Sequence, residues 1–466
     1  EFWNRGQVFD EKKEYGRAIA AYTRAIELAP NFLEAYSGRG SVLSSQGNPD
    51  AAIADFSKVI EIDPGRWQCF LLRASAYVDQ GNKDAALADL NQAIRINARI
   101  PFAYNRRGNL FQEKGVLDAA LADYNRAILI DPKRAKFYSN RGNVFRTKGN
   151  LNAALADYTK SIELDPKSAI NYCNRGSSQT AAGNLREAIS DFNQAIELDP
   201  QYAPAYYARG RARKAQGDLN AAITDFDQAI AFNSAYTADV YSQRGQAFQE
   251  KGDLQEAIAS YTRAIEIQPN RADLYRYRGF LFALNNDFDG AMIDFDKAIE
   301  RDPNCAESYR NRGNTFLQKR DLKGALADYN RSIELDPKVA GAYDSRGTVL
   351  AEMKNWKAAL ADYNRSIELA PKSALFYYNR GNFFGKTGNL DAAIADLTRS
   401  CQLNPQYAMA FYSRGACLGN QGDLDAAIRD FTRAIELDPN YVQAYRSRSM
   451  ALEAKGSLDG AIVDLQ

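Results

Sequence analysis

The dipeptide Arg-Gly, or a close variant of it, recurs along this chain at a spacing of 34 residues. The arginine stands at every station, from Arg5 to Arg448, and the glycine is replaced only at Ala74 and Ser449. A fixed period of this length indicates stacked repeats, each of which packs only on its neighbours. The sequence therefore predicts a solenoid of fourteen repeats rather than a globular enzyme. The glycines of these stations are Gly6, Gly40, Gly108, Gly142, Gly176, Gly210, Gly245, Gly279, Gly313, Gly347, Gly381 and Gly415.

Three further positions keep a constant distance from this glycine, which we call the marker glycine. The fourth residue before it is aromatic in every repeat, as at Tyr36. The twelfth residue after it is always alanine, as at Ala52, and the sixteenth is aromatic in eleven repeats, as at Phe56. Only a small side chain lets two helix backbones approach closely. We interpret all three positions as core.

Turn residues divide each repeat into two helices. A glycine such as Gly47 or Gly115 follows the marker by seven residues, where a first helix would end in a left-handed conformation. A proline such as Pro64 or Pro132 closes most repeats, because it cannot continue a helix but can begin the next one. Each repeat is therefore predicted to be helix, tight turn, helix, tight turn.

The combined pattern of aromatic residue, glycine, alanine, aromatic residue and proline resembles the tetratricopeptide repeat family from end to end. This resemblance implies an all-α fold, a right-handed superhelical solenoid of antiparallel helix pairs. The chain departs from the family pattern at four positions near its middle. Ala98 and Ser234 replace the closing proline, and Gln179 and Arg213 replace an apolar residue three positions after the marker.

We expect one continuous domain over residues 1–466, because no linker or change of composition interrupts the period. The first and last repeats look incomplete, which suggests a piece of a longer protein. One extra residue falls between 231 and 239, where the Asp-Pro turn is missing. It predicts a local change in superhelical pitch or a hinge, and a neutral loop insertion is the alternative.

Composition argues against several classes of function. The chain contains no histidine, which removes the commonest general base and most zinc-enzyme motifs, and we expect neither catalysis nor a cofactor or metal. Its formal net charge of +1 does not indicate a nucleic-acid partner, and no apolar run is long enough to span a membrane. The five cysteines follow no pair spacing, which favours a reducing compartment such as the cytoplasm. The segment 381–387 resembles a phosphate-binding loop but is one residue short and follows no strand, so we interpret it as the end of a first helix.

The arginine before the marker is followed sixteen residues later by an aspartate in most repeats, as with Arg39 and Asp55. If the two helices of a repeat are antiparallel, guanidinium and carboxylate can form a bidentate pair that fixes their register. We interpret this pattern as architecture rather than as a ligand site. Two repeats lack the acid, and their arginines, Arg5 and Arg244, are predicted to be freer to bind a ligand.

The family resemblance also implies that five stations of each first helix line a concave groove, namely residues six, three and two before the marker and one and four after it. In repeats four to seven these stations carry basic and amide side chains, and no acidic residue occurs among them. Asparagine can satisfy the backbone of an extended peptide, and the cations would attract carboxylates or phosphates. The alternative is an ordinary solvated surface. The predicted peptide-binding residues are Arg106, Asn109, Lys136, Asn140, Asn143, Arg146, Asn174, Arg211 and Lys214.

Other repeats present apolar residues at these stations or directly next to one, which could accept apolar anchors of a partner or pack against neighbouring helices. These residues are Tyr277, Phe280, Leu284, Leu375, Tyr378, Met409 and Tyr412.

Three functional interpretations remain open. The first is a non-enzymatic scaffold that binds an extended, acidic protein or peptide segment in the groove. The second is a substrate-recruiting or targeting arm of a larger enzyme of the glycosyltransferase or protease type. The third is a structural array that self-associates through uncapped end repeats.

Overall fold

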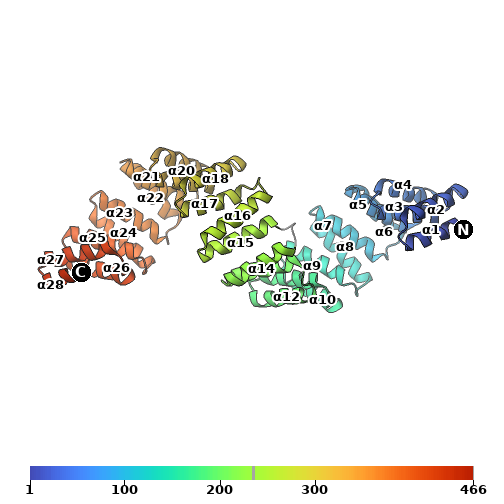
Figure 1. The fold of residues 1–466 in the computed structure, drawn as a ribbon, viewed down its shortest axis with the longest axis horizontal. Helices are drawn as coiled ribbons and strands as arrows, with labels where there is room; N and C mark the ends of the chain where they lie inside the picture. Colours follow the sequence, from blue (N-terminus) through green and yellow to red (C-terminus); the bar gives the residue numbers. More distant parts are fainter. Residues whose placement is uncertain (233–236, 465–466) are drawn as a thin grey trace. The chain divides into compact units, whose positions relative to one another are not determined.

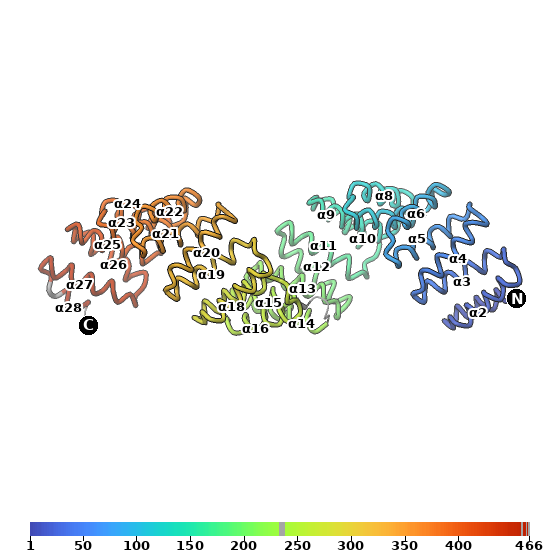
Figure 2. Tube along the Cα trace, turned by 90° about the horizontal axis from the view of Figure 1, so that it is seen from above, coloured from blue at the N-terminus to red at the C-terminus, as the bar shows by residue number. Residues whose placement is uncertain are grey.

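The computed structural model describes residues 1–232 and 237–464. The chain forms two compact units, Glu1–Tyr236 and Thr237–Gln466, and each unit is a row of antiparallel helix pairs (Figures 1 and 2). No strand occurs among the described residues. The all-α repeat fold is thus confirmed. The extra residue lies at the gap between the described ranges, so the predicted change of pitch or hinge falls outside the described residues.

In the first unit the odd-numbered helices are the first helices of their repeats, and the even-numbered ones are the second helices. The first helices are α1 (Phe2–Glu11), α3 (Leu33–Ser45), α5 (Trp67–Asp79), α7 (Pro101–Glu113), α9 (Ala135–Thr147), α11 (Ala169–Ala181) and α13 (Ala203–Ala215). The second helices are α2 (Tyr15–Leu28), α4 (Pro49–Ile62), α6 (Lys83–Ile96), α8 (Leu117–Ile130), α10 (Leu151–Leu164), α12 (Leu185–Leu198) and α14 (Leu219–Phe232).

The second unit continues the alternation. Its first helices are α15 (Thr237–Lys251), α17 (Ala272–Leu284), α19 (Ala306–Gln318), α21 (Ala340–Glu352), α23 (Ala374–Lys386), α25 (Ala408–Gln421) and α27 (Val442–Ala454). Its second helices are α16 (Leu254–Ile267), α18 (Phe288–Arg301), α20 (Leu322–Leu335), α22 (Trp356–Leu369), α24 (Leu390–Leu403), α26 (Leu424–Leu437) and α28 (Leu458–Val463). The segment that resembles a phosphate-binding loop is the end of α23, as predicted.

The marker glycine and the ring sixteen residues later form the centre of each repeat. Tyr158 is fully buried, and a Cβ placed on Gly142 would lie 2.9 Å from its Cε1 atom. The same close approach recurs between Gly108 and Tyr124. Glycine is therefore required because an aromatic ring lies directly against the backbone of the first helix. The alanine twelve residues after the marker is buried in every repeat, as predicted.

The aromatic residue four positions before the marker is less buried than the sequence pattern suggested. Only Phe70, Tyr104 and Tyr275 are buried at this station, and the other rings are partly exposed. A guanidinium group covers the ring instead, as where Arg346 lies 5.5 Å from the centroid of Tyr343. The interpretation of this station as pure core was wrong, because the ring also supports the adjacent arginine through a cation–π contact.

The predicted arginine–aspartate pairs are confirmed as bidentate contacts. Arg107 donates to both carboxylate oxygens of Asp123 at 2.8 and 2.6 Å. Its third nitrogen donates to Asn91 on α6, in the preceding repeat, at 2.7 Å. Most repeats make the same third contact, as Arg141 does to Asn125 at 2.7 Å. The arginine therefore connects two successive repeats as well as the two helices of its own repeat.

The repeats that break the arginine–aspartate pattern behave differently from one another. Arg244 donates to Ser260 at 2.8 Å and lies 4.7 Å from the ring centroid of Phe248, with a side chain only 19% exposed. The prediction that Arg244 is freer to bind a ligand was wrong, because the Ser260 hydroxyl, the Phe248 ring and the Glu256 carboxylate at 3.8 Å take the place of the aspartate. Arg5 is 61% exposed and contacts Glu1 at 3.9 Å.

Gln179 and Arg213 stand three positions after the marker, where the family has an apolar residue, and both make polar contacts. Arg213 donates to the buried Asp225 at 2.9 Å, so this carboxylate is shared with Arg209. Gln179 accepts a hydrogen bond from Asn184 at 2.8 Å, at the turn between α11 and α12.

Both predicted turns are present. The residue seven positions after the marker has a positive φ angle, as at Gly149 with 78°. In four repeats a residue other than glycine has a positive φ angle at this position, namely Lys13, Asn286, Arg320 and Lys354. The prolines after the second helices do not begin the next helix as expected: Pro64 precedes α5 by three residues. The preceding Asp63 accepts a hydrogen bond from the backbone of Gly65 at 3.1 Å, which shapes this turn.

Candidate functional site

The predicted basic residues lie on the first helices of the first unit. Arg106, Lys136, Arg146 and Arg211 are exposed, and Lys214 is partly exposed. Within the described part of the chain, no carboxylate lies within ion-pair distance of the Lys136, Arg146 or Arg211 side chain. Arg211 lies over the ring of Tyr207, 5.8 Å from its centroid. Lys136, Arg146 and Arg211 are called the basic surface below.

Arg106 is separated from this basic surface by its contacts with the preceding repeat. It donates to the carbonyl of Leu71 at 3.2 Å and to the hydroxyl of Ser75, both on α5. A hollow of about 190 Å³ beside these residues is also lined by Asp79 and Glu113. Arg106 therefore faces acidic neighbours, and its charge is less available than the charges on α9 and α13.

The predicted asparagines form an internal network. Asn140 donates to Asn105 at 2.9 Å and to Asn109 at 3.1 Å, which ties α9 to α7. Asn109 also accepts from the buried hydroxyl of Tyr124, and Asn143 accepts from Tyr158 in the same way. These contacts occupy the side-chain oxygens of Asn109 and Asn143. Their structural role was not apparent from the sequence.

Asn174 differs from the other asparagines of the predicted set. It is partly exposed on α11, and its side-chain amide forms no hydrogen bond with the described residues. Its amide therefore offers both donors and an acceptor to a ligand.

The first helices of the last three repeats of the first unit carry no acidic residue. None occurs in α9, α11 or α13, whereas α7 ends in Glu113 and α15 contains Asp239 and Glu250. The arginines that precede the marker glycines of these three helices are neutralised by aspartates of the second helices, as Arg175 is by Asp191 at 2.7 Å. The basic surface remains as an excess of positive charge.

The apolar stations lie mainly on the second unit. Phe280, Leu284, Leu375 and Met409 are between 38% and 51% exposed. The tyrosines pack against neighbouring rings instead: Tyr277 stacks on Tyr261 with centroids 5.5 Å apart. Tyr378 and Tyr412 contact Tyr407 and Tyr441, each with centroids 5.0 Å apart. The packing interpretation therefore holds for the three tyrosines, and a role of the four exposed residues in binding a partner stays a prediction.

The cysteines are unpaired, and four of the five are buried. Burial raises the pKa of Cys173 to about 12, so this thiol stays protonated near neutrality. Among the described residues, no cluster of three carboxylate or thiol groups is placed to hold a metal ion. None of the described helices has the length and hydropathy that a membrane span requires.

Family models for repeats of this kind match almost the whole chain. Models described as tetratricopeptide repeat match residues 2–32, 33–66, 68–99, 135–168, 306–339, 374–407 and 408–441. A further TPR repeat model matches residues 108–147, 176–217, 210–252, 245–286 and 347–388. The chain belongs to the tetratricopeptide repeat family. Membership identifies it as a protein-interaction scaffold, in agreement with the sequence prediction.

Solved structures with similar folds include other tetratricopeptide proteins. The APC/C hetero-tetramer Cut9–Hcn1 is 14% identical over 100% of this chain and 92% of that chain, with a TM-score of 0.46. Yeast Tom70 is 18% identical over 98% and 95%, with a TM-score of 0.42. YrrB, described as a TPR protein with an unusual peptide-binding site, is 26% identical over 42% and 97%, with a TM-score of 0.33. No curated protein matches the sequence.

Proposed function

We propose that this tetratricopeptide scaffold binds an extended acidic or phosphorylated segment of a partner protein along α9, α11 and α13. The observation that carries the proposal is the absence of acidic residues from these three first helices, on which Lys136, Arg146 and Arg211 are exposed. Carboxylates or phosphates of a bound segment would neutralise this excess charge.

The asparagine contacts refine the proposed mode of binding. Asn140 and Asn143 hold neighbouring helices and tyrosines in place, so they position the surface rather than contact the ligand. Asn174, on the helix between Arg146 and Arg211, retains an amide that can pair with the N–H and C=O groups of an extended backbone. The cations thus supply attraction, and Asn174 supplies a main-chain contact between them.

The size of the effect follows from the exposure of the charges. Exposed ion pairs contribute about 0.2–1 kcal/mol each. Loss of three such pairs corresponds to a decrease in affinity of about tenfold, since 1.4 kcal/mol is a factor of ten. The Debye length is about 10 Å at 0.1 M salt, so affinity is expected to fall steeply above that concentration.

The test is a fluorescence-anisotropy titration with a labelled twelve-residue peptide of alternating Glu and Ser, and with the same peptide phosphorylated on serine. We expect Lys136→Glu/Arg146→Glu/Arg211→Glu to weaken binding of both peptides about tenfold or more at low salt. The control variant is Arg126→Glu/Lys133→Glu/Lys167→Glu, which makes the same change in net charge at exposed residues of helix α8 and of two turns. This control is expected to bind within about twofold of the parent. Equal weakening in both variants would show that only the net charge matters and would refute the proposed site.

A further inference from the structure

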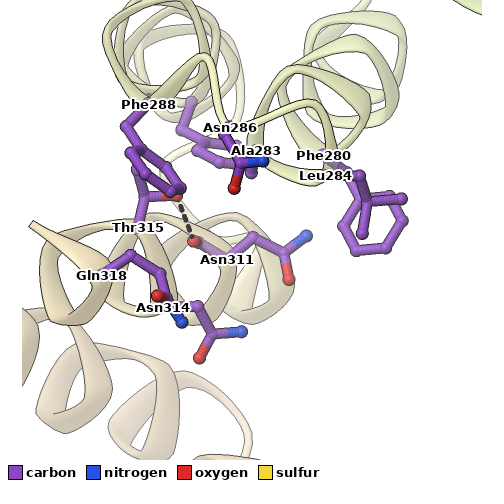
Figure 3. Close-up of a pocket in the computed structure, with 10 residues that line it drawn as sticks. Phe280, Ala283, Leu284, Asn286, Phe288, Asn311, Asn314, Thr315 and Gln318 are labelled. Carbon is purple, nitrogen blue, oxygen red and sulfur yellow. Dashed lines mark hydrogen bonds between the residues drawn. The ribbon is translucent and has the colours of Figure 1, made fainter. Parts of the chain in front are cut away.

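The hollow lined by Phe280 and Leu284 in Figure 3 lies between two successive first helices of the second unit. A different surface runs along one edge of the first unit, where each second helix ends and the next first helix begins. It consists of the turns at 97–100, 131–134 and 165–168 with the adjoining ends of α6 to α11. We call this surface the turn edge. Only the first turn of each first helix reaches it.

Phe102 stands at this edge where another repeat junction has a carboxylate. Arg66 donates to Glu34, which lies 32 residues earlier, at 2.8 Å. Phe102 is the residue 32 positions before Arg134, and the guanidinium of Arg134 lies 5.2 Å from its ring centroid. Arg134 keeps a contact with Asp131 at 3.0 Å, but its side chain is 57% exposed, against 34% for Arg66. This junction therefore presents an exposed ring and cation in place of a closed ion pair.

Two further large apolar side chains are exposed along the turn edge. Leu129, near the end of α8, is 72% exposed. Most repeats have glutamate at its station, 21 positions after the marker, as at Glu163. Ile170, in the first turn of α11, is 54% exposed, and Phe102 is 46% exposed. Removal of this surface from water would be favourable.

Basic residues surround these apolar side chains. The carboxylates of the turn edge are Asp131, Glu163 and Asp165. Asp131 already contacts Arg134, and Glu163 contacts Lys160 at 2.8 Å, so the edge keeps an excess of positive charge. Its exposed cations are Arg95, Arg99, Lys133, Arg134, Lys136 and Lys167.

The arrangement of these residues fits the surface of a lipid bilayer better than a folded protein partner. The apolar side chains stand singly among the cations, at turns and helix ends, so a protein would need a separate pocket for each of them. The interfacial layer of a bilayer accepts isolated apolar side chains, while lysine and arginine keep their charges at the level of the lipid phosphates. Anionic lipids attract such cations.

We propose that the turn edge binds the surface of an anionic lipid bilayer. The side chains of Phe102, Leu129 and Ile170 enter the interfacial layer, and the surrounding lysines and arginines contact lipid phosphates. Of the basic surface only Lys136 lies at this edge. Variants that leave Lys136 unchanged therefore test the membrane site separately from the proposed peptide site.

The test is co-sedimentation of the parent chain with large unilamellar vesicles. One set contains phosphatidylcholine alone, and the other contains about 30% phosphatidylserine. We expect binding to the anionic vesicles to be at least about tenfold tighter, because each basic residue at such a surface contributes about fivefold. Excess free phosphoserine, which has the charged group without acyl chains, should not displace the protein.

Reversal of two turn charges tests the electrostatic part. Lys133→Glu/Lys167→Glu is expected to weaken binding to the anionic vesicles about 25-fold or more, since two contributions of about fivefold are lost. The matched control is Lys338→Glu/Lys372→Glu, which changes exposed lysines at the same turn stations of the second unit. This control is expected to bind within about twofold of the parent.

Replacement of the apolar side chains tests insertion. Phe102→Ser and Leu129→Ser are each expected to weaken binding about fivefold or more. The matched control is Leu375→Ser, at the station of Phe102 in the second unit and 48% exposed, which should leave binding unchanged. Circular dichroism establishes that each variant is folded. The proposal is overturned by equal binding to neutral vesicles, by displacement with free phosphoserine, by equal losses in the matched controls, or by undiminished binding of the folded Leu129→Ser variant.

Discussion

Replacement of Asp344 by asparagine should stabilise the protein, and more strongly at high pH than at low pH. Asp344 on α21 is 6% exposed, and one of its carboxylate oxygens accepts a hydrogen bond from Asn379 on α23 at 2.6 Å. The other oxygen has no partner among the described residues. Burial raises the pKa of Asp344 to about 7, and the hydrogen bond from Asn379 opposes part of that rise.

A neutral version of the same contact already exists in the chain. Asn105 and Asn140 occupy the corresponding stations of repeats four and five, and they form a hydrogen bond of 2.9 Å. Asn105 is 5% exposed, so its environment is comparable. The variant Asp344→Asn should therefore adopt the Asn105–Asn140 geometry without rearrangement of α21 or α23.

The sign and size of the effect follow from proton linkage. An acid with a raised folded pKa binds its proton more tightly in the folded state, so the free energy of unfolding falls as pH rises from about 4 to about 7. A pKa difference of about three corresponds to about 4 kcal/mol. We expect Asp344→Asn to exceed the parent in stability by up to about 4 kcal/mol at pH 8. At pH 5 the expected gain is about 1.5 kcal/mol. This pH lies only about one unit above the pKa of an unfolded aspartate, so most of the loss of stability of the parent has not yet developed.

The assay is urea unfolding at pH 5, 6, 7 and 8, combined with hydrogen exchange of α21 and α23 to follow local stability. The adjacent Tyr363 and Tyr407 have pKa values raised by burial to about 12, so they do not titrate in this range. The reverse substitution, Asn105→Asp, should destabilise the protein more at pH 8 than at pH 5. A difference between Asp344→Asn and the parent that does not change with pH would refute the reasoning.

Three further predictions concern the repeat architecture. Arg244 now donates a hydrogen bond to Ser260 at 2.8 Å, and Ser260→Asp should give it the bidentate carboxylate partner that the other repeats have. The free energy of unfolding should rise by about 1 kcal/mol in urea titrations. An unchanged value would contradict this prediction. Gly142→Ala should cost about 1–3 kcal/mol, because the added Cβ lies 2.9 Å from Tyr158. The added substitution Tyr158→Leu should recover part of that loss, and a purely additive double mutant would argue against a local clash. Lys354→Gly should stabilise by up to about 1 kcal/mol in thermal unfolding, because φ is 62° at this residue, whereas a lower melting temperature would show that chain entropy dominates.

The helix pairs could be predicted from the sequence because their determinants are local and periodic. The marker glycine and the ring sixteen residues later specify close packing of two helices within one repeat, as Gly108 and Tyr124 illustrate. The bidentate pair of Arg107 and Asp123 was predictable for the same reason, since both residues belong to one repeat.

Contacts between repeats were less predictable, because they depend on the rotation from one helix pair to the next. The third hydrogen bond of Arg107, to Asn91, crosses such a boundary. So do the bonds of Asn140, which turn a predicted ligand contact into a structural one. Arg244 was misjudged because the compensating ring of Phe248 lies four residues later, outside the sixteen-residue pattern. The exposed positions of Lys136, Arg146 and Arg211 were predicted, and their role in binding stays a prediction.

The most direct test of the proposed function is affinity capture from the native proteome followed by cross-link mapping of the captured segment. The bait is the parent chain, the variant Lys136→Glu/Arg146→Glu/Arg211→Glu, or the charge-matched control Arg126→Glu/Lys133→Glu/Lys167→Glu. Asn140 is left unchanged because it ties α9 to α7. We predict a partner that the parent and the control capture, that the first variant loses, and that cross-links to α9–α13 through an acidic or phosphorylated segment. Capture of the same partners by all three chains, or cross-links from a segment without acidic groups, would contradict the account.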